Sequence, residues 1–271
     1  MGTHLLAYFS NTTFGATLAN VTVVNDDIVT KTGTGDRFLC PVDYNAVFAA
    51  SALGTTLTRA LFTTPSLEVR REVFEILPRA ASAVVFAARS LQAYLPPQDL
   101  LLQAPENIIC QTADSSGAGV AKYASIWLKK PGPIPPMATG DVRVARSTSA
   151  TTLTANVWST CAITLDKDFE PGTYQQVGLI GESANSIYAR QIFPALTYRP
   201  GVPVLAGTEA AAADYGFAEL LRFEYYNMGS FPHTNLPQTQ FLSSAADTAE
   251  QVFLYVIKTG PPGTAIVPPG S

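Results

Sequence analysis

The densest group of titratable side chains in the sequence is a run of three carboxylates, Asp166, Asp168 and Glu170, in LDKDFE. Their alternate spacing would place all three on one face of a strand, where paired carboxylates could act as the acid and base of a glycosidase. The run resembles a calcium loop only loosely, because it lacks the glycine and the distal glutamate of an EF-hand. Since Pro171-Gly172 follows at once, we predict a solvated strand end entering a turn.

Histidine chemistry would have to come from His4 or His233, the two histidines of the chain. We expect His4 to lie on a mobile amino terminus and His233 to lie in a loop. A Ser–His–Asp triad could combine His233 with Asp214 or Asp247. GESAN at 181–185 begins like a nucleophile elbow, but asparagine replaces the second glycine and the flanking pattern is strand–turn–strand. We therefore predict no catalytic residues and no enzymatic activity.

Phosphate and metal sites are not predicted either. GAGVAK at 117–122 has neither the Walker spacing nor the dinucleotide-binding fingerprint. Cys40, Cys110 and Cys161 lie far apart, without the CxxC spacing of a zinc site. Cys110 and Cys161 fall in apolar, strand-like runs, which is typical of buried free thiols in a reducing compartment. The prediction is no bound cofactor and no metal.

Aromatic residues form another candidate site late in the chain. The five that fall close together are Phe217, Phe223, Tyr225, Tyr226 and Phe231. Such a group could build a carbohydrate-binding platform or a surface that stacks nucleic-acid bases. Buried aromatic side chains also dominate protein cores and subunit interfaces, and we favour this packing role.

The elements around these residues are predicted to be β-strands. Three apolar runs rich in β-branched and aromatic residues follow one another at Trp158–Leu165, Tyr174–Ile180 and Ile187–Phe193. Turn signals containing Pro, Gly or Asn separate them, as in Glu170-Pro171-Gly172. Similar runs are predicted as strands at Leu18–Val24, Ile28–Lys31, Arg37–Pro41, Ala81–Ala88, Ile108–Gln111, Tyr123–Leu128, Val142–Ser147 and Gln251–Lys258. This pattern predicts a mainly β protein, an antiparallel β-sandwich.

Helices are predicted to be short and to lie in the connections. Tyr44–Leu53 is rich in alanine and is followed by Gly54, which favours a short helix. Pro65–Leu77 has helical apolar spacing with Ser66 as a candidate cap, although the alternation in Val73–Leu77 also permits a strand. Thr208–Asp214 is predicted as an alanine-rich loop. Phe217–Tyr226 is predicted as either a strand or a short helix.

A proline-rich stretch divides the chain near its midpoint. KKPGPIPP at 129–136 contains four prolines and a glycine, which exclude a central strand or helix. We predict an N-terminal sandwich over residues 1–130, a linker over 131–137 and a C-terminal sandwich over 138–258. The alternative is one domain with a proline-rich surface loop. Residues 259–271 are rich in Pro and Gly, which indicates an extended tail.

Charged residues make up 14% of the chain, against roughly 25% in ordinary soluble domains. A surface this neutral suits either a Thr/Ser-rich β-protein or a protein whose surface packs against other subunits, since interface cores are depleted of charge. The net charge is −4 and the basic residues are scattered. This argues against sequence-specific nucleic-acid binding, which needs a clustered positive face.

The amino-terminal residues lack the basic segment and long apolar run of a signal peptide, and their sixth residue, Leu6, does not match a myristoylation signal. No stretch reaches the roughly 18 apolar residues that a membrane span needs. We therefore expect synthesis in a cytoplasm without membrane insertion of this segment.

The second half resembles a known group of proteins in several short segments. These are the strand with Trp158, the run EPGTYQQVG at 170–178, ARQIF at 189–193, YRPG at 198–201, and Phe223 followed by GSF at 229–231. Together they are similar to the jelly-roll major capsid proteins of small tailless icosahedral bacteriophages, of an adenovirus–tectivirus-like lineage. The resemblance implies two tandem jelly rolls and a structural virion protein that self-assembles, as a homotrimer, into an icosahedral capsid shell.

Physical arguments agree with this resemblance. A shell subunit needs few charges, rigid β-layers and extended arms that reach its neighbours, and residues 259–271 could be such an arm. The expected partners are copies of the same chain, other virion proteins and an internal membrane where a shell encloses one. Without a basic arm, the chain would not neutralise a genome. Two alternatives stay open: a β-sandwich binding module, such as a phage decoration or receptor-binding protein, and a hydrolase using His233 or the carboxylate run.

Overall fold

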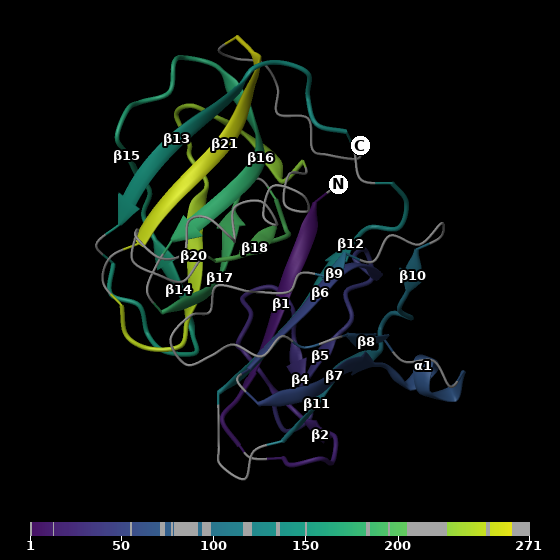
Figure 1. Cartoon of the computed structure of the whole chain (residues 1–271). Coiled ribbons are helices and arrows are strands. Elements are labelled where there is room, and N and C mark those ends of the chain that lie inside the picture. Colours follow the sequence, from purple (N-terminus) through teal and green to yellow (C-terminus); the bar gives the residue numbers. More distant parts are fainter. Residues whose placement is uncertain are drawn as a thin grey trace. The chain divides into compact units, whose positions relative to one another are not determined.

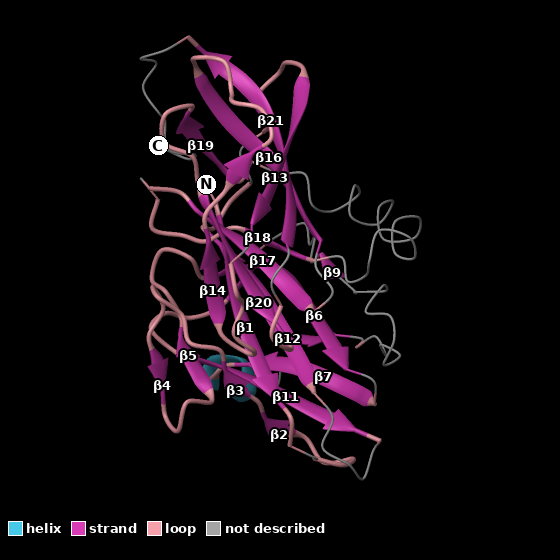
Figure 2. Cartoon of the chain, turned by 90° about the vertical axis from the view of Figure 1, so that its left-hand side faces the viewer, coloured by secondary structure: helices cyan, strands magenta, loops and turns pink. Residues whose placement is uncertain are grey.

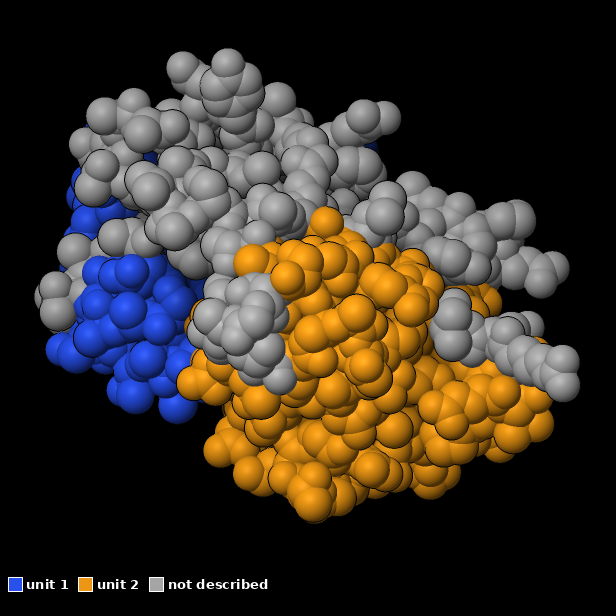
Figure 3. Space-filling view, turned by 60° about the horizontal axis from the view of Figure 1, so that its bottom comes forward, with its two compact units in different colours: residues 1–4, 132–271 blue, residues 5–131 orange. Residues whose placement is uncertain are grey.

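The structure of the chain is a computed structural model. It describes residues 2–12, 14–54, 56–70, 74–76, 78, 92–93, 99–115, 121–133, 136–149, 151–182, 185–194, 196–204, 227–247 and 250–261. The chain divides into two compact units, coloured separately in Figure 3. Unit 2 is Leu5–Pro131, and unit 1 is Gly132–Ser271 together with Met1–His4.

Unit 2 contains two sheets of six strands each and one short helix within the described residues (Figures 1 and 2). Its elements are β1 (Thr3–Ser10, of which Thr3 and His4 group with unit 1), β2 (Ala19–Asn20), β3 (Thr22–Val23), β4 (Lys31–Thr32), β5 (Arg37–Leu39), β6 (Ala46–Gly54), β7 (Leu57–Thr63), α1 (Pro65–Val69), β8 (Phe74–Ile76), β9 (Gln92–Ala93), β10 (Leu100–Leu101), β11 (Asn107–Asp114) and β12 (Lys122–Lys129). One sheet has the order β10-β6-β12-β1-β3, with β9 on β6, and the other has the order β4-β5-β11-β7-β8, with β2 on β11.

Unit 1 contains a five-stranded and a four-stranded sheet. Its strands are β13 (Val142–Ser149), β14 (Trp158–Cys161), β15 (Thr164–Leu165), β16 (Thr173–Glu182), β17 (Ser186–Ile192), β18 (Gly201–Pro203), β19 (Gly229–Pro232), β20 (Gln238–Ser243) and β21 (Glu250–Gly260). The larger sheet has the order β15-β13-β21-β16-β19, and the smaller has the order β14-β20-β17-β18.

The two units repeat one topology. In unit 2 the eight principal described strands along the chain are β1, β5, β6, β7, β8, β10, β11 and β12, and in unit 1 they are β13, β14, β16, β17, β18, β19, β20 and β21. Numbered 1 to 8 in this order, they form one sheet with the order 1-8-3-6 and one with the order 2-7-4-5 in both units. This is the strand order of a jelly roll, an antiparallel sandwich of two Greek keys. The predicted fold class is confirmed.

Aromatic and small residues fill the space between the sheets of each unit. In unit 2, the ring of Tyr8 on β1 lies edge-on to Phe38 and Phe62 of the opposite sheet, with ring centroids 5.3 and 5.7 Å apart. In unit 1, a Cβ on Gly181 of β16 would lie 3.0 Å from Phe241 of β20, so the sheets approach closely where this side chain is missing. Burial of these apolar surfaces is the main favourable term in folding.

The strand β6 corrects the helix predicted over Tyr44–Leu53. All but one of its residues are buried, because it lies inside its sheet between β10 and β12. In the antiparallel register with β12, Ala49 pairs with Trp127 and Ala50 pairs with Ile126. Small side chains on one strand thus lie opposite bulky ones on the next, and tertiary packing overrides the weak helix preference of alanine.

The segment Pro65–Leu77 also differs from the predicted single helix. The helix α1 stops at Val69, and β8 pairs antiparallel with β7, so the strand alternative for its later part is correct where the structure describes it. The cap is Thr64 rather than Ser66: the Thr64 side chain accepts the Leu67 N–H at 3.4 Å, and Pro65 fills the first helical turn.

The amino terminus was expected to be mobile, and this is wrong for the described residues. Thr3–Ser10 forms β1, of which every residue except Phe9 is buried. The strands predicted over Leu18–Val24 and Arg37–Pro41 are present but shorter, as β2, β3 and β5. The strand predicted over Ile28–Lys31 is wrong except at Lys31, because β4 runs over Lys31–Thr32 and residues 28–29 form a bend. The predicted segments Ala81–Ala88, Thr208–Asp214 and Phe217–Tyr226 lie outside the described residues.

The later predicted strands are confirmed as β11 to β17 and β21, although β18, β19 and β20 were missed, as were β7, β9 and β10 earlier in the chain. Along β21, Val252, Leu254 and Val256 are buried while Phe253 and Tyr255 are half-buried, the period-2 pattern of a strand with one face inward. The three cysteines are buried free thiols, as predicted. Among the described residues, α1 is too short to cross a membrane.

Candidate functional site

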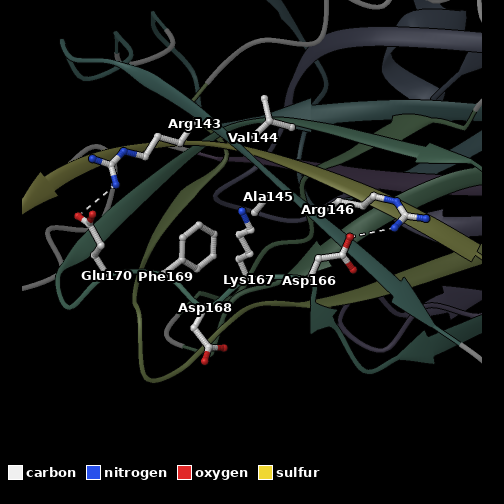
Figure 4. Close-up of a pocket in the computed structure, with 9 residues that line it drawn as sticks. All are labelled: Arg143, Val144, Ala145, Arg146, Asp166, Lys167, Asp168, Phe169 and Glu170. Atoms are coloured by element: carbon white, nitrogen blue, oxygen red, sulfur yellow. Dashed lines mark hydrogen bonds and ion pairs between the residues drawn. The ribbon is translucent and has the colours of Figure 1, made fainter.

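The connection between β14 and β16 positions the carboxylate run beside β13. Its strand β15 pairs with Ser147 and Thr148 of β13. The Asp166 N–H then donates to the Arg146 carbonyl oxygen at 3.1 Å. After this bond, the connection leaves β13 and encloses a pocket between itself and the strand, shown in Figure 4.

The pocket has a volume of about 370 Å³. Residues of β13 form one wall and the loop after β15 forms the other; together they are Arg143, Val144, Ala145, Arg146, Asp166, Lys167, Asp168, Phe169 and Glu170. Figure 4 shows an ion pair on either side of the pocket and the Phe169 ring between them. Three basic and three acidic side chains line the pocket, so their formal charges cancel.

Two of the three carboxylates are bound to basic side chains. Asp166 pairs with Arg146 at 2.9 Å, and Glu170 accepts from both Arg143 and Lys258 at 3.2 Å. Hydrogen bonds from Lys258 and then Arg143 lower the pKa of Glu170 below its usual value. A general acid needs a raised pKa so that it carries a proton at neutral pH, and the lowered pKa of Glu170 is the opposite of this requirement.

The predicted one-sided strand of carboxylates is not formed. The strand β15 ends at Leu165, and Asp166 to Glu170 lie in an irregular loop, with Asp166, Asp168 and Glu170 exposed. This agrees with the prediction of a solvated strand end. Among the described residues, no three His, Cys, Asp or Glu side chains are grouped closely enough to hold a metal ion.

The two histidines act as hydrogen-bond partners of the backbone. The Nδ1 atom of His233 accepts the Gly172 N–H at 3.2 Å, and the His233 N–H donates to the Gly172 carbonyl at 3.0 Å. The buried His4 accepts the Arg199 N–H on Nδ1 at 3.1 Å. These contacts join turns and strand ends.

The proposed triad is not assembled by the residues that the structure describes. Asp247 accepts the Asn185 N–H at 3.0 Å, which is a separate network from that of His233. Ser183 and Asp214 lie outside the described residues. GESAN lies between β16 and β17, so a strand precedes and a strand follows it, as predicted.

Phe231 of the aromatic group and Lys122 of GAGVAK are both described, and both are buried in unit cores. Phe231 is fully buried and stacks on Tyr174, with ring centroids 6.0 Å apart, which confirms core packing for this member. Phe217, Phe223, Tyr225 and Tyr226 lie outside the described residues. Lys122, the last residue of GAGVAK, is buried and forms an ion pair with Asp114 at 3.0 Å, which is a structural role.

Sequence reasoning missed the open edge of β13. Among the described residues, the strand on the side of β13 away from β21 is β15, which pairs with Ser147 and Thr148 alone, while Val142 and Val144 are 53% and 55% exposed. The available signal was VRVAR, in which exposed valines alternate with arginines. That pattern predicts a strand but does not show which edge is left unpaired.

Comparisons with known proteins give distant structural matches only. No protein-family model matches the sequence, and no curated protein matches it. The major capsid protein P2 from bacteriophage PM2 is similar with a TM-score of 0.22 and 11% identity over 90% of this chain and 97% of that chain. The STIV MCP is similar with a TM-score of 0.24 and 9% identity over 95% and 97%. At these TM-scores the similarities do not bear on function, and the fold rests on the strand order of the two units.

Proposed function

We propose that the chain is a structural virion protein, the major capsid protein of an icosahedral shell, acting by self-assembly. The observation that carries this is the repeated jelly roll: one chain contains two sandwiches with the same 1-8-3-6 and 2-7-4-5 strand orders. Viral capsid proteins are among the main users of this fold, although lectin domains and cupins share it. We take residues 1–130 and 138–258 as the two domains, joined by the linker 131–137 and followed by the arm 259–271.

A duplicated sandwich suits the construction of a shell. Three copies around a threefold axis would bring six similar sandwiches together, a nearly hexagonal block that can tile a surface. Closed symmetric oligomers of this kind are the common form of protein assemblies. The homotrimer is therefore our proposed building block, and other virion proteins and any internal membrane are its proposed further partners.

Exposed apolar side chains at one end of unit 2 support lateral contacts. Val42, in the connection between β5 and β6, is 72% exposed, and Val69, in α1 between β7 and β8, is 85% exposed. In a jelly roll, these two connections lie at the same end of the sandwich. Exposed large apolar side chains at one end of a sandwich favour an interaction surface there, and the low charge content of the chain agrees with this.

The remaining parts of the proposal follow from the same features. The binding of Asp166 and Glu170 to basic side chains favours a non-enzymatic role. The scattered basic residues favour a shell that leaves genome neutralisation to counterions or other proteins. We place the protein in the virion after synthesis in the host cytoplasm.

The test is the size of the purified protein by light scattering, followed by electron microscopy across salt concentrations. Shells, sheets or trimers that associate further are expected. The charge-introducing variant Val69→Glu should reduce this association, whereas Val69→Thr, which keeps the size and branching of the side chain, should reduce it less. A monodisperse monomer or small oligomer at every salt concentration would overturn the proposal. The pocket of about 370 Å³ would then favour the alternative, a binding module.

A further inference from the structure

We propose that the open edge of β13 receives an added strand, the segment Gly263–Val267 of a second copy of the chain. This inference rests on the proposed self-assembly and names one contact that would build it. Strand addition to an exposed sheet edge is a common mode of recognition, with main-chain hydrogen bonds for affinity and side-chain pockets for specificity.

The hydrogen-bonding direction along β13 leaves backbone groups available at this edge. The Arg146 carbonyl points away from β21, because it accepts the Asp166 N–H on that side. Groups two residues apart on a strand point the same way, so the N–H and C=O of Val144 and Val142 also face away from β21. The neighbouring strand β15 pairs with Ser147 and Thr148 and does not extend to these residues.

The space beside the edge is suited to an uncharged segment. The pocket of about 370 Å³ lies along Arg143 to Arg146, between β13 and the loop after β15. Its ion pairs, Arg143–Glu170 at 3.2 Å and Arg146–Asp166 at 2.9 Å, neutralise charge on either side of it. The side chains of Val144 and Phe169 supply apolar surface. A charged partner would have to compete with these ion pairs, whereas an apolar one would not.

The chain contains a matching segment after β21. Residues 259–271, TGPPGTAIVPPGS, carry no ionisable side chain. The proline pairs at 261–262 and 268–269 lack N–H groups, so they limit strand pairing to Gly263–Val267. Ile266 and Val267 are β-branched and favour a strand. A five-residue segment thus meets an open edge of four residues, Val142–Ala145.

The direction of the chain favours a second copy over the same copy. In the β13–β21 register, Ile257 pairs with Val142, so the chain leaves β21 at the start of β13. To reach the open edge of its own β13, the tail would have to reverse direction within Pro261–Gly263. Consecutive prolines are stiff and extended, which opposes such a reversal. We therefore infer that the segment pairs with a second copy of the chain.

Disulfide trapping between two full-length variants tests this contact. One variant carries Val144→Cys and a small tag, and the other carries Ile266→Cys. The native cysteines are buried, so the introduced thiols should react selectively. We expect a mixed disulfide between the two chains after mild oxidation. Moving the tail cysteine to residue 264 should preserve the bond and moving it to 265 should weaken it, because strand side chains alternate.

The control replaces Val144→Cys with Val157→Cys, at a valine that is 46% exposed and lies outside β13 and outside the proposed lateral contact, which should give only the background of random collision. A mixed disulfide equally strong with this control would overturn the proposal. A single chain carrying both Val144→Cys and Ile266→Cys that closes only an internal disulfide would also overturn it, since the tail would then occupy its own edge.

Electron microscopy of the same samples separates this inference from the proposed function. Shells or sheets without the mixed disulfide would overturn strand addition and leave the capsid proposal standing. The mixed disulfide without any larger assembly would support strand addition and count against the capsid. Absence of both would overturn both.

Discussion

The buried ion pair between Lys122 and Asp114 offers the sharpest test of how unit 2 is held together. The Lys122 side chain is 1% exposed and that of Asp114 is 0% exposed, with Nζ and Oδ2 3.0 Å apart. The same ammonium donates to the Thr12 carbonyl and lies 4.9 Å from the centroid of the Phe14 ring. The Asp114 carboxylate also accepts the Phe14 N–H at 3.1 Å. The pair therefore ties the ends of β11 and β12 to residues 12–14.

The change is Lys122→Met, which keeps most of the side-chain volume and removes the charge. At 3.0 Å and an effective dielectric of about 20, the attraction lost is about 5 kcal/mol. Desolvation of the ammonium offsets part of it, and breaking a buried pair from one side costs about 3–5 kcal/mol because the remaining charge is left buried. That is a large part of the roughly 5–15 kcal/mol that stabilises a typical domain.

Urea unfolding followed by tryptophan fluorescence measures this cost. Trp127 lies on β12, the same strand as Lys122, and is buried. Trp158, in unit 1, is changed to Phe in every variant so that the signal reports unit 2 alone. The double variant Lys122→Met with Asp114→Leu should recover to within about 2 kcal/mol of the starting protein, because it removes both buried charges.

The control is Arg59→Met in the same unit. Arg59 pairs with Glu75 at 2.7 Å, but the two side chains are 49% and 42% exposed. Its loss should cost far less than the loss of Lys122, as is usual for solvated pairs. If Lys122→Met costs no more than this control, or if the double variant is as unstable as the sum of its single changes, the reasoning from burial is refuted.

Three further predictions follow from other described residues. Burial raises the pKa of the Cys40 thiol to about 12, so a thiol reagent at pH 8 should leave the thiol unmodified until urea unfolds the chain, and rapid labelling of the native protein would contradict this expectation. Because the thiol ionises more readily in the unfolded chain, the free energy of unfolding should also fall as the pH rises from about 9 towards 12. Hydrogen bonds from Lys258 and Arg143 lower the pKa of Glu170, so carbon NMR should show its carboxylate titrating below the usual glutamate range. Lys258→Met should raise the midpoint of this titration, and an unchanged midpoint would exclude the Lys258–Glu170 contact in solution. A Cβ on Gly172 would lie 2.8 Å from the Gly260 carbonyl oxygen, so Gly172→Ala should lower the free energy of unfolding, measured by urea titration, by about 1–3 kcal/mol. An unchanged free energy of unfolding would show that the ends of β16 and β21 can separate.

Much of the candidate site could be predicted from local residue patterns. The solvated end at Asp166 to Glu170 follows from the adjacent Pro171-Gly172 turn, and both are observed. The exact partners could not be predicted, because Arg143 and Lys258 are distant from Glu170 in the sequence and reach it only through the pairing of β13 with β21. The pocket and the open edge depend on the pairing of β13 with β15, which is also made by residues apart in the sequence.

The helix predicted over Tyr44–Leu53 shows where local patterns fail. Its alanines favour a helix only weakly, by a few tenths of a kcal/mol per residue over common alternatives. Placing Ala49 opposite Trp127 allows close packing in the sheet, and this term is larger. A short stretch of sequence shows the helix propensity of its residues, but it does not show which strand they will pair with in the fold. Lys122 is similar, since its sequence context gives no sign of the buried Asp114 beside it.

By itself, the sequence determined that this is a mainly β protein with little charge and a proline-rich break near its midpoint. Period-2 alternation, β-branched runs and Pro/Gly turns each involve only a few neighbouring residues, so they can be recognised in the sequence without knowledge of the fold. Only the tertiary structure decided that both halves close in the same jelly-roll order, that β6 is a strand, and that one edge of β13 stays open. These features depend on contacts between residues far apart in the chain, such as Val142 with Ile257, whose energies arise only when the strands are brought together.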